Sequence, residues 1–346
     1  MDPVRYPHPA YRITLDDQDL TPKLRPRLRS LTLCLARGGE ADQLDLVLDD
    51  HDGGLQIPST GVELALWIGY VGDLVDMGTF TVDEIEHSGA PDELHIRARS
   101  ANLRAELRSR TERSWHGTTL GSIVKTLAKK HGLAARVDPR LASRAVTHED
   151  QSESDVAFLQ RLAKRFDAVA TVKKDRLLFL PIQGTQTSTG APLPTITLTR
   201  AAGDQHRYHT SDRDAYTGVV AYWHDPARAK RRGVVVGTRK NAKRLRETFT
   251  DEASARAGAQ AEWKRIQRGA ATLQLTLALG RADLAPQTPV AVTGFKPQID
   301  AGEWLTVKVT HTLGDGGFTT SVELENGAAA EDTGEAAEDV SNEVDE

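Results

Sequence analysis

The sequence lacks several features that are common in secreted, membrane and metal-binding proteins. It contains one cysteine, Cys34, so it can form no intramolecular disulfide and no cysteine-rich metal site. Cys34 lies in the strand-like run LTLCLA, where a small buried side chain is expected. No apolar stretch approaches the roughly 20 residues that span a bilayer, and the first ten residues lack the apolar region of a secretory signal. We therefore expect a protein that folds in a reducing cytoplasm and does not enter a membrane.

Motifs that carry chemistry are also missing. The sequence has no Walker-type phosphate loop, no G-x-G-x-x-G, no G-x-S-x-G and no H-E-x-x-H. His206 and His209 form an H-x-x-H without a third ligand nearby, and a polar loop is the better interpretation. Residues 49–54, DDHDGG, lack the order and the distal glutamate of a calcium loop, so we expect a turn between strands. The sequence thus predicts no catalytic, cofactor-binding or metal-binding residues.

Charge is distributed unevenly along the chain. The formal net charge is −5. Residues 327–346 contain no lysine or arginine and eight acids, namely Glu331, Asp332, Glu335, Glu338, Asp339, Glu343, Asp345 and Glu346. The remainder is therefore mildly basic. Because this acidic segment is rich in Ala, Gly, Ser and Asn and poor in apolar residues, we expect it to be disordered.

A basic run occupies residues 228–246 and contains nine lysines and arginines with no acid between them. The favoured interpretation is a solvated hairpin tip, DPARAKRRG, followed by a polar connection. The second is a surface for an acidic protein partner. A nucleic-acid site is disfavoured because the run has no aromatic residues on which single-stranded bases could stack.

Most of the chain shows the period-2 alternation of short β-strands. Between residues 11 and 105, segments such as YRITLDD, DQLDLVLDD and DELHIRARS alternate apolar and polar residues and are separated by turn-forming residues. Similar segments resume at residue 195 and continue to residue 326. Many short strands at this spacing predict an antiparallel sandwich or barrel.

The period changes to that of helices between the two β-rich halves. TTLGSIVKTLAKKHG predicts a helix with Thr118 or Thr119 as N-cap and Gly132 at its end. SESDVAFLQRLAKRF predicts a second helix, capped by Ser152 or Ser154, and AVATVKKDRLLFLP predicts a hairpin after it. A third helix, TDEASARAGAQAEWKRIQRG, interrupts the second half.

These patterns predict a mainly β protein with an α+β insert. We expect a first β domain at residues 1–105, the insert at 106–185, a second β domain at 186–326 and the acidic segment at 327–346. Residues 183–194 read as a linker. The third helix is expected to be capped by Thr250 and to be followed directly by Gly269.

Three segments resemble the phage late control D and VgrG hub family. RSRTERSWHGTTLGSIVKTLAKKHGL and SESDVAFLQRLAKRF resemble its T-L-G-x-I-V and E-S-D-x-x-F-L-x-R-L segments. GFKPQIDAGEWLTVKVTHTLGDGGFTTSVELEN resembles its closing segment. They occur in the family's order and, with the regions between them, cover most of residues 5–326.

The resemblance implies a baseplate hub of a contractile injection machine, such as a phage tail or a phage-tail-like bacteriocin. Such hubs are homotrimers in which two tail-tube-like β-barrels per chain form a pseudo-hexameric ring. The ring would bind the trimeric spike and tail tube proteins, initiate tube assembly, and contact tape-measure or baseplate wedge proteins. No enzymatic activity and no cofactor are implied. Assembly in the bacterial cytoplasm and incorporation into the virion are expected.

Two other classes of function stay open on the sequence alone. A peptidoglycan-hydrolysing tail component would need a carboxylate pair held across a cleft. A nucleic-acid-binding module would use the basic run 228–246, and its affinity would fall steeply with salt.

Overall fold

The computed structural model describes residues 7–100, 109–173, 176–182, 193–210 and 216–327. Most of the predicted linker and nearly all of the acidic segment, whose disorder stays a prediction, therefore lie outside the described residues. None of the helices in the described ranges is long and apolar enough to cross a membrane.

The elements fall into four groups along the chain. The first β-rich half contains β1 (Pro9–Leu15), β2 (Gln18–Asp19), α1 (Thr21–Leu24), β3 (Leu28–Ala36), β4 (Gln43–Asp49), β5 (Glu63–Tyr70), β6 (Asp73–Ser88) and β7 (Glu93–Ser100). The insert contains β8 (Arg113–Thr119), α2 (Leu120–Lys130), β9 (Ala134–Val137), α3 (Pro139–Ala142), β10 (Ala145–Gln151), α4 (Asp155–Arg165), β11 (Ala168–Lys173) and β12 (Arg176–Pro181). The second β-rich half contains β13 (Ile196–Thr199), η2 (Arg200–Ala202), β14 (Gly203–Thr210), β18 (Ala271–Leu277), β19 (Pro289–Thr293), α6 (Pro297–Asp300), β20 (Trp304–Gly314) and β21 (Gly317–Asn326). Within this half lies a βββα unit of β15 (Gly218–Asp225), β16 (Lys230–Gly237), β17 (Ala242–Phe249) and α5 (Glu252–Gly269).

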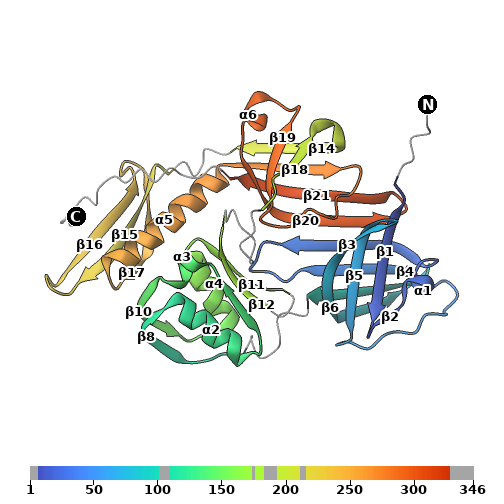
Figure 1. Ribbon diagram of the computed structural model, residues 1–346, viewed down its shortest axis with the longest axis horizontal. Coiled ribbons are helices and arrows are strands. Elements are labelled where there is room, and N and C mark those ends of the chain that lie inside the picture. Colours follow the sequence, from blue (N-terminus) through green and yellow to red (C-terminus); the bar gives the residue numbers. More distant parts are fainter. Residues whose placement is uncertain (1–6, 101–108, 174–175, 183–192, 211–215, 328–346) are drawn as a thin grey trace.

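Among the described strands, the two β-rich halves join into one sheet of 13. Its order is β14-β18-β21-β20-β3-β4-β7-β6-β5-β1-β2, with β19 pairing both β20 and β13 (Figure 1). The prediction of a mainly β protein is confirmed. Two separate closed barrels are not found among the described strands, because β20 pairs with β3 and so connects the halves edge to edge.

The alternation seen in the sequence sets which face of this sheet is buried. β4 alternates between buried and partly exposed positions along its length, with Leu44, Leu46 and Leu48 buried. Its neighbour β3 does the same with Leu31, Leu33 and Leu35. Successive side chains of a strand point to opposite faces, so one face of each strand enters the core. A single hydrophobic cluster runs through both halves of the sheet.

The pairing of β3 with β20, here called the β3–β20 seam, contains a fully buried histidine. His311 on β20 lies opposite Leu33, and its Nδ1 is 3.0 Å from the hydroxyl of Thr320. Burial lowers the pKa of His311 to about 4, although the nearby Leu284 backbone and Asp283 act in the opposite direction. The imidazole is therefore neutral at pH 7, and protonating it would place a charge inside the seam.

We expect the His311→Gln variant to lose part of the acid sensitivity of the protein. The pKa of His311 falls from 6.5 to about 4 on folding, so this group contributes stability above pH 6.5 that is lost as the pH falls. Between pH 7 and pH 5 the loss amounts to about 2 kcal/mol. Urea unfolding at both pH values should show that the free energy of unfolding falls less between pH 7 and pH 5 in the variant than in the parent protein. Equal decreases in the two proteins would contradict the lowered pKa of His311.

The insert folds around its own core, as the helix periodicity predicts. The cap of α2 is Thr119, which accepts a hydrogen bond from the Ser122 amide, and Gly132 follows its end with a positive φ of 65°. The cap of α4 is Ser154, which accepts from the Ala157 amide. The predicted hairpin is confirmed as β11 and β12, and β12 also pairs with β9 in parallel. β8 and β10 form a second small sheet.

The βββα unit was predicted only in part. Its hairpin β15–β16 and its helix α5 were expected, whereas β17 covers residues that were assigned to a polar connection. The helix is capped by Asp251, whose carboxylate accepts from the Ser254 amide, while Thr250 donates to that carboxylate. Gly269 is the last helical residue rather than the one after it.

Candidate assembly surfaces

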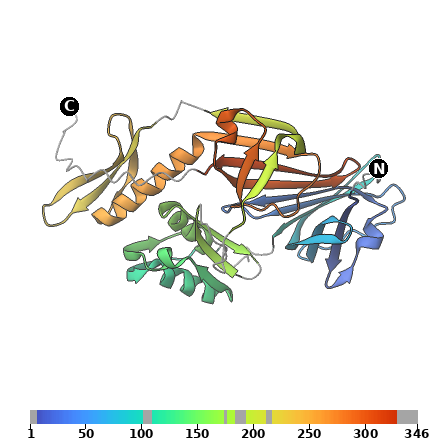
Figure 2. The same ribbon diagram turned by 45° about the horizontal axis from the view of Figure 1, so that its top comes forward.

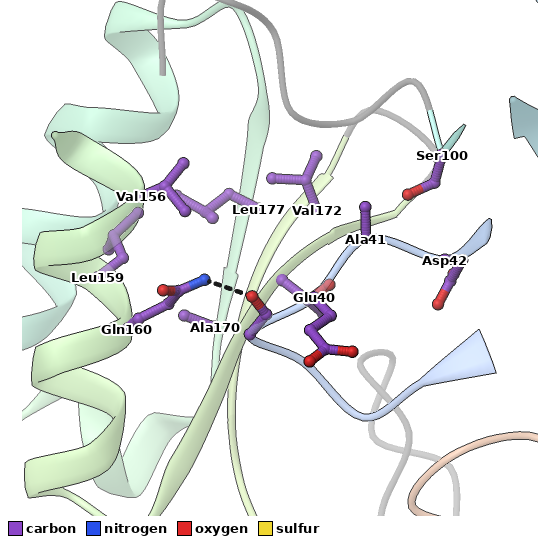
Figure 3. A pocket seen from close by; sticks show the side chains of 12 residues that line it. Glu40, Ala41, Asp42, Ser100, Val156, Leu159, Gln160, Ala170, Val172 and Leu177 are labelled. Atoms are coloured by element: carbon purple, nitrogen blue, oxygen red, sulfur yellow. Dashed lines mark hydrogen bonds between the residues drawn. The ribbon is translucent and has the colours of Figure 1, made fainter. Parts of the chain in front are cut away.

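The insert contacts the first β-rich half through the turn between β3 and β4. Gln160 on α4 donates to the Gly39 carbonyl at 3.0 Å (Figure 3). The Lys173 ammonium lies 3.1 Å from Asp42. Gly38 adopts a φ of 149°, and a Cβ there would lie 2.6 Å from Val169, so the close approach requires glycine. The cavity between these parts is only about 30 Å³. It is a joint between the two parts, since the space is too small for a ligand.

One buried arginine connects all four groups of elements. Arg268, in the last turn of α5, is 2% exposed. Its Nη1 lies 2.8 Å from a carboxylate oxygen of Asp167, which connects α4 to β11, and its Nη2 also bonds Asp167. Its Nε lies 3.1 Å from Glu325 on β21, which in turn pairs with Arg37 beside the end of β3. This four-residue set, here called the junction network, ties the βββα unit, the insert and both halves of the large sheet together.

A second charged region lies between the insert and the βββα unit. A cavity of about 550 Å³ opens between α4, β17 and α5. Its lining includes seven basic side chains, which define the basic groove: Arg161, Lys164, Arg165, Lys243, Arg244, Arg246 and Arg265. The structure thus brings part of the basic run 228–246 together with basic residues of α4, which lie about 80 positions earlier in the chain and show no sequence signal that links them to the run. In Figure 2 the insert lies alongside α5.

Carboxylates satisfy only part of the charge of the basic groove. Arg161 forms ion pairs with Glu149 and Glu153, Arg165 with Glu149 and Glu247, and both Lys243 and Arg265 with Glu262. Among the described residues, seven basic side chains thus line the groove, and the four carboxylates pair with four of them. Burial lowers the pKa of Arg265; Asp167 counteracts this and Arg268 adds to it. The groove therefore carries excess positive charge in a partly desolvated site.

Edges and apolar side chains of the large sheet are also open to partners. β14 pairs with β18 alone among the described strands, so its other edge is unpaired. Val71, in the turn between β5 and β6, is 73% exposed, and Leu279 is 53% exposed. The turns that hold them are connected by a hydrogen bond of 3.0 Å from the Tyr70 hydroxyl to the Gly280 carbonyl. Exposed sheet edges and apolar side chains of this kind are usual at protein–protein contacts.

The structure also places the weaker motifs of the sequence. His206 and His209 lie on strand β14, not in a loop, and His206 packs edge-on against Phe295. Residues 50–54 form the predicted turn, where Asp52 pairs with Arg27. Among the described residues, no group of three or more His, Cys, Asp or Glu side chains could hold a metal ion.

Asp155 is a buried residue whose role the sequence analysis missed. The motif SESD places it in the first turn of α4, where its carboxylate is completely buried. It accepts hydrogen bonds from Lys130 and His131 at 2.7 Å and from Gln151 at 2.6 Å. Burial would raise the pKa of Asp155, but these three bonds outweigh it and lower the pKa. The carboxylate thus fastens the end of α2 to the start of α4.

The overall architecture defines the class of protein first. The structure matches the crystal structure of a tail protein from Neisseria meningitidis MC58 with a TM-score of 0.69, over 92% of this chain and 97% of that chain. Sequence identity is only 14%, so this likeness concerns the fold. The chain therefore shares the fold of that tail protein.

Sequence comparison then gives the family. Two relatives, from Escherichia phages 186 and P2, are each named "Probable baseplate hub protein". They are 45% and 43% identical to this chain, and the matches cover 92% of this chain and 92% and 93% of theirs. The family described as "Phage tail baseplate hub (GPD)" matches residues 39–317. The chain belongs to the phage tail baseplate hub family.

Proposed function

We propose that this chain is a structural hub of a phage-type baseplate that joins a trimeric spike to a hexameric tail tube. The observation that carries the proposal is the continuous sheet across the β3–β20 seam, because it fixes two β-rich halves side by side in one rigid chain. Three such chains would present six similar β units in a ring, which matches threefold symmetry on one face with sixfold symmetry on the other.

The surfaces described above supply contacts for such a ring. The unpaired edge of β14 and the exposed Val71 and Leu279 would be covered by neighbouring chains, because exposed edges and apolar residues favour association. The tail tube protein would be seeded on one face, and tape-measure and baseplate wedge proteins would contact the same assembly. The role is architectural, with no covalent chemistry. Assembly in the bacterial cytoplasm would precede incorporation into the virion.

Light scattering of the purified chain, alone and with its trimeric spike partner, tests this proposal. We expect a mass about three times the 37.8 kDa of one chain, or a complex of three chains with three spike chains. Val71→Lys should weaken this assembly, since it places a charge in an apolar contact. The control Lys125→Glu changes an exposed residue of α2 on the insert. A stable monomer that ignores the spike would contradict the proposal.

A further inference from the structure

We propose that the acidic segment, residues 327–346, binds in the basic groove of its own chain. There it would hold the insert against the βββα unit and neutralise the groove. The inference concerns contacts within one chain, so it does not depend on the trimer or on spike binding. It gives a common role to two features that the hub fold leaves unexplained, namely the eight acids of the segment and the positive charge of the groove.

The position of the last described strand puts the segment within reach. β21 ends at Asn326, and the Gly327 amide donates to the Glu303 carbonyl. Glu325, the residue before Asn326, forms an ion pair with Arg268 in the last turn of α5. From Arg268, the helix leads back to Gly258 at the far side of the groove, a distance of about 15 Å at 1.5 Å per residue.

Only a short stretch of chain therefore separates the first acids of the segment from the groove. Glu331 follows Gly327 by four residues, which span up to about 13 Å when extended. The later acids can cover the rest of the groove. A segment of this length closes such a distance at modest entropic cost, because its attachment point is already fixed beside α5.

Charge complementarity favours this occupant. Lys164 on α4 and Arg246 on β17 are exposed and take part in no ion pair with the described residues. They lie on different elements that line the groove, so the carboxylates of the acidic segment would pair with both. Several ion pairs formed together in one partly desolvated site stabilise a contact more than one isolated ion pair on the surface does.

Single-stranded nucleic acid fits the groove less well. Phe249 is the one aromatic side chain among the described residues that line the groove, and it is buried. It packs beneath Gly258, where a Cβ would lie 2.5 Å from the ring. A base could not stack on it, and stacking supplies much of the affinity for single strands.

Zero-length carbodiimide cross-linking of the full chain, followed by peptide mass spectrometry, tests the proposal. The reagent joins carboxylates to amines that are already in contact. At about 0.05 M salt we expect links from residues 331–346 to Lys164 and Lys243 that exceed links to Lys125 and Lys129 by roughly five-fold or more. The latter two lysines lie on the exposed side of α2 and serve as internal controls. The preference should vanish at about 1 M salt, where charges are screened within a few ångströms.

Two matched variants separate this contact from general attraction. Arg246→Glu should abolish the preference for Lys164, since it reverses a groove charge without changing the reporting lysine. Arg136→Glu reverses an exposed charge on β9 and should leave the preference intact. Links spread evenly over all lysines would overturn the proposal. Cross-links between isotope-labelled and unlabelled copies would overturn the assignment of the contact to one chain. Salt-sensitive binding of single-stranded DNA that is not reduced by the bound acidic segment would assign the groove to nucleic acid instead.

Discussion

The Arg268→Met variant is expected to lose about 3–5 kcal/mol of folding free energy, because one partner of a buried charge network is removed. Arg268 is almost fully buried, donates hydrogen bonds to Asp167 and forms an ion pair with Glu325. Methionine fills much of the space but leaves both carboxylates without their central cation. Urea unfolding followed by circular dichroism measures the loss.

The matched control lies on the same helix. Arg256 pairs with Glu252 four residues earlier on the solvent side of α5, and both are substantially exposed. Arg256→Ala should cost at most about 0.5 kcal/mol, as expected for an exposed helical ion pair. If Arg268→Met costs no more than this control, the junction network does not stabilise the fold.

A second substitution distinguishes charge from packing at the same place. Asp167 has a positive φ of 51°, a conformation that asparagine tolerates, so Asp167→Asn preserves the backbone. When it is combined with Arg268→Met, the carboxylate charge that has lost its arginine partner is removed, whereas Glu325 keeps its pair with Arg37. We expect the double variant to be more stable than the sum of the single losses predicts, by about 1 kcal/mol or more. Strict additivity would mean that the Arg268 effect comes from lost packing.

The elements that could be predicted from sequence are those whose signals are local. α2, α4 and the β11–β12 hairpin each combine an apolar stripe or alternation with a capping or turn residue within a few positions. β17 is not predicted because three of its eight residues are basic and only Phe249 is buried along it, so it shows little alternation. Its pairing with β15 is decided by the tertiary structure.

The β3–β20 seam could not be predicted for a different reason. Leu33 and His311 are paired across 278 positions in the chain, and nothing in the periodicity of either strand encodes that partner. The same holds for the basic groove, which combines residues near 161 with residues near 246. The division at residues 1–105, 106–185 and 186–326 stays a prediction, although a single hydrophobic cluster unites the two β-rich halves.

The Asp155→Ala variant should cost the insert about 3–5 kcal/mol, because it removes the one acceptor that three converging donors share in a buried site. His131 and Gln151 are themselves buried and cannot turn to solvent, whereas Lys130 can. Asp150→Ala is the control: this neighbour also accepts bonds, from Ser114 and His148, but it is exposed, so a loss below about 1 kcal/mol is expected.

The pH dependence of this effect separates a lost charge from a simple cavity. Folding lowers the pKa of Asp155, so its contribution is present above the unfolded carboxyl value near 3.9 and is lost as the pH falls further. The difference in unfolding free energy between Asp155→Ala and the parent should therefore be greatest near pH 7 and shrink below about pH 4. A cavity alone would give the same difference at every pH. Hydrogen exchange should show the loosening in α2 and α4, since the carboxylate joins these two helices and the large sheet has its own core.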